Sequence, residues 1–183
     1  MRKIGKDFIH VCAESLPITE PVMEFGAYQV EGQEGFADLR PLFPGKKYVG
    51  CDVRQGPGVD LIVDAQMTSL PDGSVGTVLS VDTLEHVVDP AAVAREAFRI
   101  LREDGIFILV TVMNFIIHEH PQDYWRFTPG GIGLLLGIFP ERLVVSAGNP
   151  LNPHTVAGVG AKRPGTIGES FRKGLDAWKV RFK

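Results

Sequence analysis

The clearest pattern of apolar and polar positions lies in the middle of the chain. An apolar, β-branched run over residues 77–81 predicts a buried strand, and Asp82 follows where that strand should open into a loop. A helix should come next, because the Asp-Pro pair at 89–90 is typical of a helix start and apolar residues then recur at helical spacing until Gly105. Residues 106–112 form a second apolar run. Strand, helix and strand in this order predict a βαβ unit of a parallel sheet covered on both faces.

Weaker patterns precede this unit. Residues 22–26 predict a first strand and its turn, residues 36–43 a helix, and residues 47–52 a second strand. A third short strand is expected over residues 60–65. Since a parallel crossover needs a dozen or more residues, either the usual helix between the second and third strands is trimmed to a loop or the third strand is marginal.

The second half of the chain continues with alternating elements. Thr128 is expected to cap a helix that begins at Pro129. Two further strands are predicted over residues 142–147 and 155–161, joined by a turn rich in Gly, Asn and Pro. Residues 1–20 show no clear periodicity, and we expect them to be partly helical or draped on the domain.

The last residues predict an amphipathic helix. One apolar stripe recurs at intervals of four, three and four residues, and basic side chains surround it. Such a helix can pack on its own sheet, on a second subunit as in a homodimer, or on an anionic membrane surface as a peripheral contact. The stripe consists of Phe171, Leu175, Trp178 and Phe182.

Composition narrows the class of protein. With 183 residues, 44% of them hydrophobic, the chain fits one globular domain, and no apolar run could form an integral membrane segment or a signal peptide. Cys12 and Cys51 are too few for a disulfide framework, so we expect reduced thiols and a cytoplasmic protein. The net charge of −3 combines +5 over residues 162–183 with −8 over the rest, and this acidic body argues against nucleic acid as a partner.

The central part of the chain contains the segment from Asp82 to Val87, the Asp-Pro pair after it, a helix that carries Arg-Ile-Leu-Arg, and an Asp-Gly pair before a strand. In these features it resembles the class I S-adenosylmethionine-dependent methyltransferases, of the type 11-like kind. The resemblance implies a Rossmann-like α/β fold, with a seven-stranded, mostly parallel sheet, an antiparallel last strand and three αβα layers. It divides the chain into an N-terminal extension (1–20), a methyltransferase-like domain (21–162) and a basic amphipathic C-terminal helix (163–183).

The resemblance also implies where S-adenosylmethionine binds. Asp52 closes the second strand, where a carboxylate can accept two ribose hydroxyl groups at once. Asp64 matches the position that contacts the adenine amino group. Tyr28 occupies the place of a glycine that this turn usually has, which removes backbone freedom there. The expected cofactor-binding residues are Glu24, Gly26, Tyr28, Asp52, Val53, Asp64, Ala65, Asp82 and Leu84.

The acceptor side is expected in two loops that follow buried strands. His86 could act as a base or orient an acceptor, with Asp123 and Tyr124 as further candidates for catalysis. The aromatic residues around 124–127 favour an acceptor pocket or lid, with Trp125 and Arg126 binding the substrate. Alternatively, the aromatic side chains simply cover the sheet while Arg126 pairs with Asp123. Two histidines flank Glu119, but no distant ligand pair is evident, so we predict no metal.

Three functions fit these patterns. The first is an S-adenosylmethionine-dependent methyltransferase that acts on a small-molecule, saccharide or lipid-linked acceptor by in-line methyl transfer. The second is a catalytically degenerate relative that serves as a binding or scaffold subunit, suggested by Tyr28 and the short second crossover. The third is a nicotinamide-dependent oxidoreductase, for which the missing glycine is more damaging because a pyrophosphate must lie against that turn.

Overall fold

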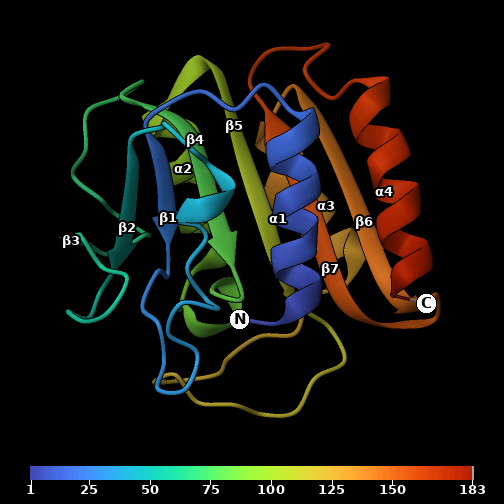
Figure 1. Cartoon of the computed structure of the whole chain (residues 1–183), viewed down its shortest axis with the longest axis horizontal. Coiled ribbons are helices and arrows are strands. Elements are labelled where there is room, and N and C mark those ends of the chain that lie inside the picture. The colour runs from blue at the N-terminus through green and yellow to red at the C-terminus, as the bar shows by residue number, and fades with distance from the viewer. Residues whose placement is uncertain (183) are drawn as a thin grey trace.

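The computed structural model describes residues 1–182, and within them a single mixed sheet organises the chain (Figure 1). Its seven strands lie in the order β3-β2-β1-β4-β5-β7-β6. The first five pair in parallel, whereas β7 inserts beside β5 and runs antiparallel to both of its neighbours. The strands are β1 (Val22–Phe25), β2 (Tyr48–Asp52), β3 (Leu61–Ile62), β4 (Val75–Val81), β5 (Leu101–Val112), β6 (Glu141–Asn149) and β7 (Asn152–Ala161).

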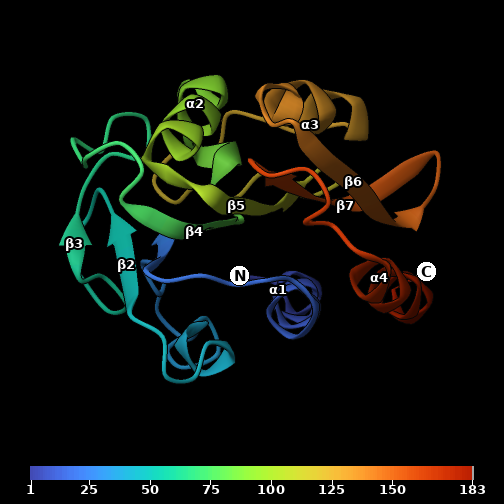
Figure 2. The ribbon, with the colours of Figure 1, turned by 90° about the horizontal axis from the view of Figure 1, so that it is seen from above.

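Helices cover both faces of this sheet and make three layers. Figure 2 shows α2 and α3 on one face and α1 and α4 on the other. This arrangement confirms the expected α/β fold class, including the antiparallel last strand. The α-helices are α1 (Lys3–Ser15), α2 (Pro90–Ile100), α3 (Pro129–Leu135) and α4 (Glu169–Arg181), and the 3-10 turns are η1 (Arg40–Leu42), η2 (Leu84–His86) and η3 (Leu136–Ile138).

Local sequence explains the elements that were predicted best. Every residue of β4 is buried, as expected for a central parallel strand with both faces covered. The Asp89 carboxylate accepts a hydrogen bond from the Ala92 N–H at 3.0 Å, and Pro90 follows as the first helical residue of α2. Thr128 caps α3 in the same way through the Gly131 N–H at 3.0 Å. The βαβ unit and both helix starts are therefore confirmed.

Three boundaries differ from the prediction. Residues 36–43 form only the turn η1, because Pro41 and Pro44 prevent a continuous helix. Helix α2 ends at Ile100 rather than at Gly105, and β5 begins at once. In the described part of the chain no helix lies between β2 and β3, and β3 itself is only two residues long and exposed, so both alternatives left open by the sequence apply.

The two terminal helices pack together against the sheet. The Trp178 ring lies 5.3 Å from that of Phe8, and its Nε1–H donates to the Ile4 carbonyl at 3.1 Å. Phe171, Leu175 and Trp178 are buried in the same core cluster as α1. The apolar stripe of α4 is thus used within the chain, which is the first of the three alternatives. No helix among residues 1–182 is long and apolar enough to cross a membrane.

Candidate functional site

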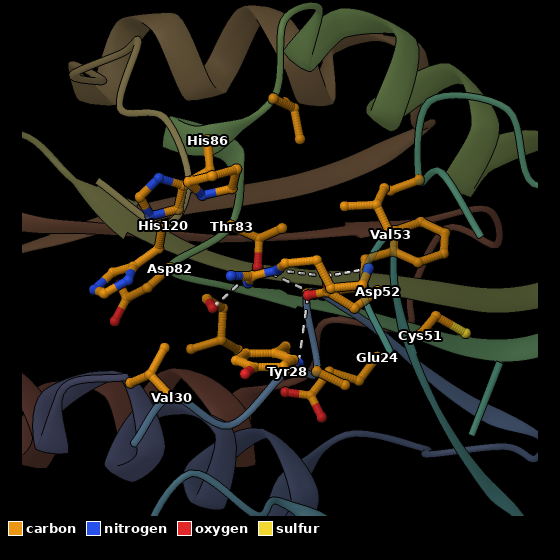
Figure 3. A pocket seen from close by; sticks show the side chains of 18 of the residues that line it. Glu24, Tyr28, Val30, Cys51, Asp52, Val53, Asp82, Thr83, His86 and His120 are labelled. Atoms are coloured by element: carbon orange, nitrogen blue, oxygen red, sulfur yellow. Dashed lines mark hydrogen bonds and ion pairs between the residues drawn. The ribbon is translucent and has the colours of Figure 1, made fainter. Parts of the chain in front are cut away.

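A cavity of about 320 Å³ opens at the carboxyl ends of β1, β2 and β4 (Figure 3). In parallel sheets this edge collects polar groups from consecutive strands and is the usual place for a ligand. Most of the residues predicted from the sequence line this cavity: Glu24, Gly26, Tyr28, Asp52, Val53, Asp64, Ala65, Asp82, His86 and Tyr124.

The turn after β1 requires glycine at one position. Gly26 has φ +78°, which is the left-handed region, and a Cβ there would lie 2.1 Å from the Thr83 Oγ1. The Thr83 hydroxyl is held by the carbonyls of Phe25 and Val81 at 3.1 Å, so it cannot easily move away. The first and fourth strands therefore approach each other closely at the floor of the cavity.

Asp52 ends β2 with its carboxylate held in place and only 8% of the residue exposed. Its Oδ1 accepts from the Arg54 N–H at 2.9 Å and from the Arg54 Nε at 3.2 Å. The only hydrogen bond to Oδ2 among the described residues is a long one of 3.4 Å, from the Tyr28 N–H. Oδ2 therefore keeps capacity to accept a hydroxyl group from a ligand.

Tyr28, at the unusual position in the first turn, is accommodated by a glycine on the next loop. A Cβ on Gly56 would lie 2.3 Å from the Tyr28 Cε2, so the ring needs the space that Gly56 leaves. The Arg54 guanidinium lies over the Tyr28 ring, 4.2 Å from its centroid. The ring, which lines the cavity, is thereby held by two residues of the loop after β2.

Asp82 follows β4 in a strained backbone conformation, with φ +49° at a residue that is not glycine. Its carboxylate is bound by Arg2, whose Nη2 donates to Oδ1 at 2.6 Å and whose Nε donates to Oδ2 at 3.3 Å. The remaining guanidinium N–H groups go to Thr155 and to the carbonyls of His154 and Thr111. Arg2 thus fixes the loop after β4 against the start of α1.

Two further acidic residues line the cavity in different environments. Burial raises the pKa of Glu24 to about 7, although the Tyr48 hydroxyl donates to it at 2.6 Å. Asp64 is exposed, and its Oδ1 accepts from the Gln66 N–H at 2.8 Å. The neighbouring Ala65 is buried and brings backbone to the same wall.

Beyond the loop after β4, an acid and three histidines gather. Glu85 is fully buried, and burial together with the nearby Asp82 charge raises its pKa to about 8. The His86 ring lies 4.8 Å from that of His118 and 6.2 Å from that of His120. Burial lowers the pKa of His86 and of His120. These rings line the outer part of the cavity, where Figure 3 shows His86 and His120 on the same side.

Four predicted site residues lie outside the cavity wall. Leu84 is 1% exposed and packs in the core beneath η2, because the turn directs it inward. Asp123 and Arg126 form a two-pronged ion pair at 2.5 and 2.7 Å, which holds the pKa of Asp123 well below its usual range. Trp125 donates its Nε1–H to the Val87 carbonyl at 2.9 Å. These contacts match the alternative in which the loop is structural and Arg126 pairs with Asp123.

Sequence reasoning missed three residues of this region: Arg2, Arg54 and Glu85. Arg2 was placed in a segment without periodicity, although it lies 80 residues from its partner Asp82. Arg54 lies two residues after Asp52, the last residue of the second strand, and this position could have indicated it. Glu85 stands inside the quoted Asp82 to Val87 motif, but its burial depends on contacts with β5 that sequence does not display.

Comparisons with known proteins agree with this geometry. Residues 42–109, less than half of the chain, match the family model described as a methyltransferase domain. A probable S-adenosylmethionine-dependent methyltransferase of Mycolicibacterium smegmatis is 35% identical over 65 residues, which are 36% of this chain and 23% of that protein. The chain spans less than half the length of the curated relatives it matches.

Solved structures extend the likeness of fold to most of the chain. A possible histamine N-methyltransferase of Thermotoga maritima has a TM-score of 0.64 at 19% identity, covering 87% of this chain and 92% of its own. The 1,6-didemethyltoxoflavin-N1-methyltransferase of Burkholderia thailandensis, whose structure contains bound 1,6-didemethyltoxoflavin and S-adenosylhomocysteine, has a TM-score of 0.61 at 16% identity. That match covers 87% of this chain and 77% of the other.

Proposed function

We propose that this chain, which carries a class I S-adenosylmethionine-dependent methyltransferase domain, binds S-adenosylmethionine in the cavity and transfers its methyl group to an acceptor. The observation that carries the proposal is the convergence of four strand ends on one cavity. Gly26, Asp52, Asp64 and Asp82 come from four different strands or the loops that follow them, yet all line it. When bound, the cofactor supplies a methyl group activated by a positive sulfur.

The residues present suit the parts of that cofactor. Asp52 Oδ2 would accept ribose hydroxyl groups, because its other oxygen is already engaged by Arg54. Asp64 and the backbone of Ala65 would face the adenine. The close approach at Gly26 leaves room for the methionine end beside Asp82.

For the acceptor we propose a small molecule, a saccharide or a lipid-linked compound. The outer cavity combines aromatic walls, among them Phe115 and the half-exposed Tyr124, with the imidazoles of His86 and His120, whose pKa values are lowered by burial. A donor and an acceptor held together here would react in line, so positioning and exclusion of water are the main duties of the protein. His86 is the proposed base: its Nδ1 faces the Gln122 carbonyl, which leaves Nε2 free to accept a proton.

The two cysteines, both buried and unpaired, suit a reducing compartment, and we propose the cytoplasm. A partner of α4, whether a second copy or a membrane, would have to use its exposed basic residues, because the apolar stripe is already buried.

Calorimetric titration with S-adenosylhomocysteine tests the donor site. Asp52→Ala should weaken binding by about 100-fold or more, since charged hydrogen bonds contribute about 1.5–3 kcal/mol each. Asp72→Ala is the matched control, because Asp72 is an exposed carboxylate outside the cavity. Equal affinity in the wild type and in Asp52→Ala, or no binding to either, would refute the proposed donor site.

Turnover separates an enzyme from a scaffold. Protein incubated with methyl-labelled donor and cell extract should transfer label to the small-molecule, saccharide or lipid fraction. Binding of S-adenosylhomocysteine without transfer to any fraction would favour the degenerate binding subunit, for which the departure at Tyr28 is the specific observation.

A further inference from the structure

Three potential metal-binding groups meet at the mouth of the cavity. Glu85 and His86 come from η2 after β4, and His118 comes from the loop after β5. One ligand atom from each lies within 4.8 Å of the other two. The sequence shows no distant ligand pair for His118 and His120, whereas in the fold the end of the neighbouring strand brings Glu85 and His86 to His118.

The hydrogen bonds of the two histidines fix which nitrogen carries the proton. His86 Nδ1 lies 2.5 Å from the Gln122 carbonyl oxygen, an acceptor only. His118 Nδ1 lies 3.2 Å from the Ile116 carbonyl oxygen and 3.2 Å from the Asp123 carboxylate. Both Nδ1 atoms must therefore donate, which leaves both Nε2 atoms with a lone pair. A histidine held by a carboxylate or carbonyl at its far nitrogen is the usual arrangement around metal ions.

The supporting carboxylate is itself rigid. Asp123 is held by both Nη atoms of Arg126 and by the His118 backbone N–H at 2.7 Å. Its side chain is 1% exposed, so these hydrogen bonds hold the loop that carries His118 from its buried side. Asp123 thus acts as a positioning residue for the His118 ring.

The buried carboxyl group of Glu85 has one engaged and one unengaged oxygen among the described residues. Its Oε2 accepts from the Thr111 hydroxyl at 2.8 Å, but Oε1 is buried and has no hydrogen-bond partner among the described residues. Oε1 lies 4.0 Å from His118 Nε2. A buried polar atom without a hydrogen-bond partner destabilises the folded state. A divalent cation that displaces the Glu85 proton would satisfy Oε1 and the lone pairs of both Nε2 atoms at once.

We propose that Glu85, His86 and His118 bind a divalent transition-metal ion of the zinc class. Two imidazoles and one carboxylate are borderline ligands that favour Zn²⁺ and its neighbours over Mg²⁺ or Ca²⁺. Ligand atoms around a tetrahedral ion lie about 3.3–3.5 Å apart, so the side chains need to close by about 1 Å. Three protein ligands leave an open position toward the cavity, beside His120.

The metal-binding inference stands independently of methyl transfer. A role of the ion in binding the acceptor rests on the proposed function, and there Nε2 of His86 would hold the ion instead of taking a proton. The two proposals can fail separately, because zinc binding is measured without donor or acceptor. Asp52→Ala should lose S-adenosylhomocysteine binding and keep zinc binding.

The test uses full-length protein that has been stripped with a chelator and then titrated with Zn²⁺ by calorimetry. We expect one equivalent to bind, and Co²⁺ to give the visible absorption of a site with nitrogen and oxygen ligands. Glu85→Gln and His118→Asn should each lower the Zn²⁺ affinity at least 100-fold. His10→Asn is the matched control, since His10 lies on α1 beside Glu14 and outside the cavity.

Glu85 is buried, so far-UV circular dichroism must show that Glu85→Gln folds. His118→Asn, on a surface loop, provides a second variant that does not depend on the core. Absence of stoichiometric Zn²⁺ binding would overturn the proposal. Zn²⁺ affinity that is unchanged in both variants would overturn it equally, because the ion would then sit elsewhere.

Discussion

The contact between Tyr28 and Gly56 decides whether the donor cavity stays open, and Gly56→Ala tests it directly. The new Cβ would lie 2.3 Å from Cε2 and 2.9 Å from Cδ2 of the tyrosine ring. Ordinary carbon contacts begin near 3.5 Å, so the ring must move by about 1 Å or more. Gly56 does not have a positive φ, so backbone strain does not contribute. Tyr28 lines the cavity, so we expect the displaced ring to enter it.

We expect two measurable effects. Crowding of this kind costs about 1–3 kcal/mol of unfolding free energy, and we expect the lower half of that range because Tyr28 is only partly buried. A ring displaced into the cavity should weaken S-adenosylhomocysteine binding about 10-fold, which corresponds to about 1.4 kcal/mol. Urea denaturation measures the first effect and calorimetry measures the second.

A second substitution separates the contact from other causes. In Tyr28→Ala/Gly56→Ala the clash is absent, so binding should recover relative to Gly56→Ala alone, with a coupling energy of about 1 kcal/mol or more. Gly133→Ala is the matched control, because its Cβ meets nothing within 4 Å and alanine is favoured inside α3. Wild-type affinity in Gly56→Ala, or a double variant no better than the single one, would refute the reasoning.

Three further substitutions probe the cavity floor. Gly26→Ala should lose about 2–4 kcal/mol of unfolding free energy in urea and most donor affinity, from left-handed strain and the 2.1 Å approach to Thr83; an unchanged urea midpoint would contradict this. Arg2→Ala leaves the Asp82 carboxylate, whose side chain is 9% exposed, without its charged partner and should cost about 3 kcal/mol in the same assay, whereas Arg2→Lys should recover only part of it. The pKa of Glu24 is raised to about 7, so the folded state holds this proton more tightly than the unfolded chain; its contribution is complete below pH about 4.5 and is lost as pH rises through 7. The melting temperature of the ligand-free protein should therefore fall over that interval by the equivalent of about 3 kcal/mol, and Glu24→Gln should remove this fall; an identical pH profile in the variant would show that Glu24 is not responsible.

The sequence alone determined the elements whose causes are local. A strand buried on both faces needs a continuous apolar run, and residues 77–81 and 106–112 have one. The caps at Asp89 and Thr128 act within three residues, so they could be recognised without a partner. The strand ends then placed Asp52 and Asp82 at one edge, since parallel strands share their carboxyl ends.

The spacing of apolar residues predicted the wrong local structure where a proline or a tight turn determined the backbone. Leu39 and Phe43 are both buried at helical spacing, yet the prolines around them allow only a turn. Leu84 follows the predicted strand end like Asp82, but η2 turns it into the core, so the two side chains serve different purposes. Side-chain direction in a tight turn depends on backbone angles that the order of residues does not reveal.

Only the tertiary structure decided which distant groups meet. Arg2 and Asp82 are 80 residues apart, and Glu85 and His118 come from loops after two different strands. Tyr28 looked like an obstacle in the sequence, and it fits because Gly56, on another loop, has no side chain. Apolar periodicity fixes the elements since burial acts on every residue of a strand or helix. A site needs a few atoms placed within an ångström, and that placement exists only after the strands have paired.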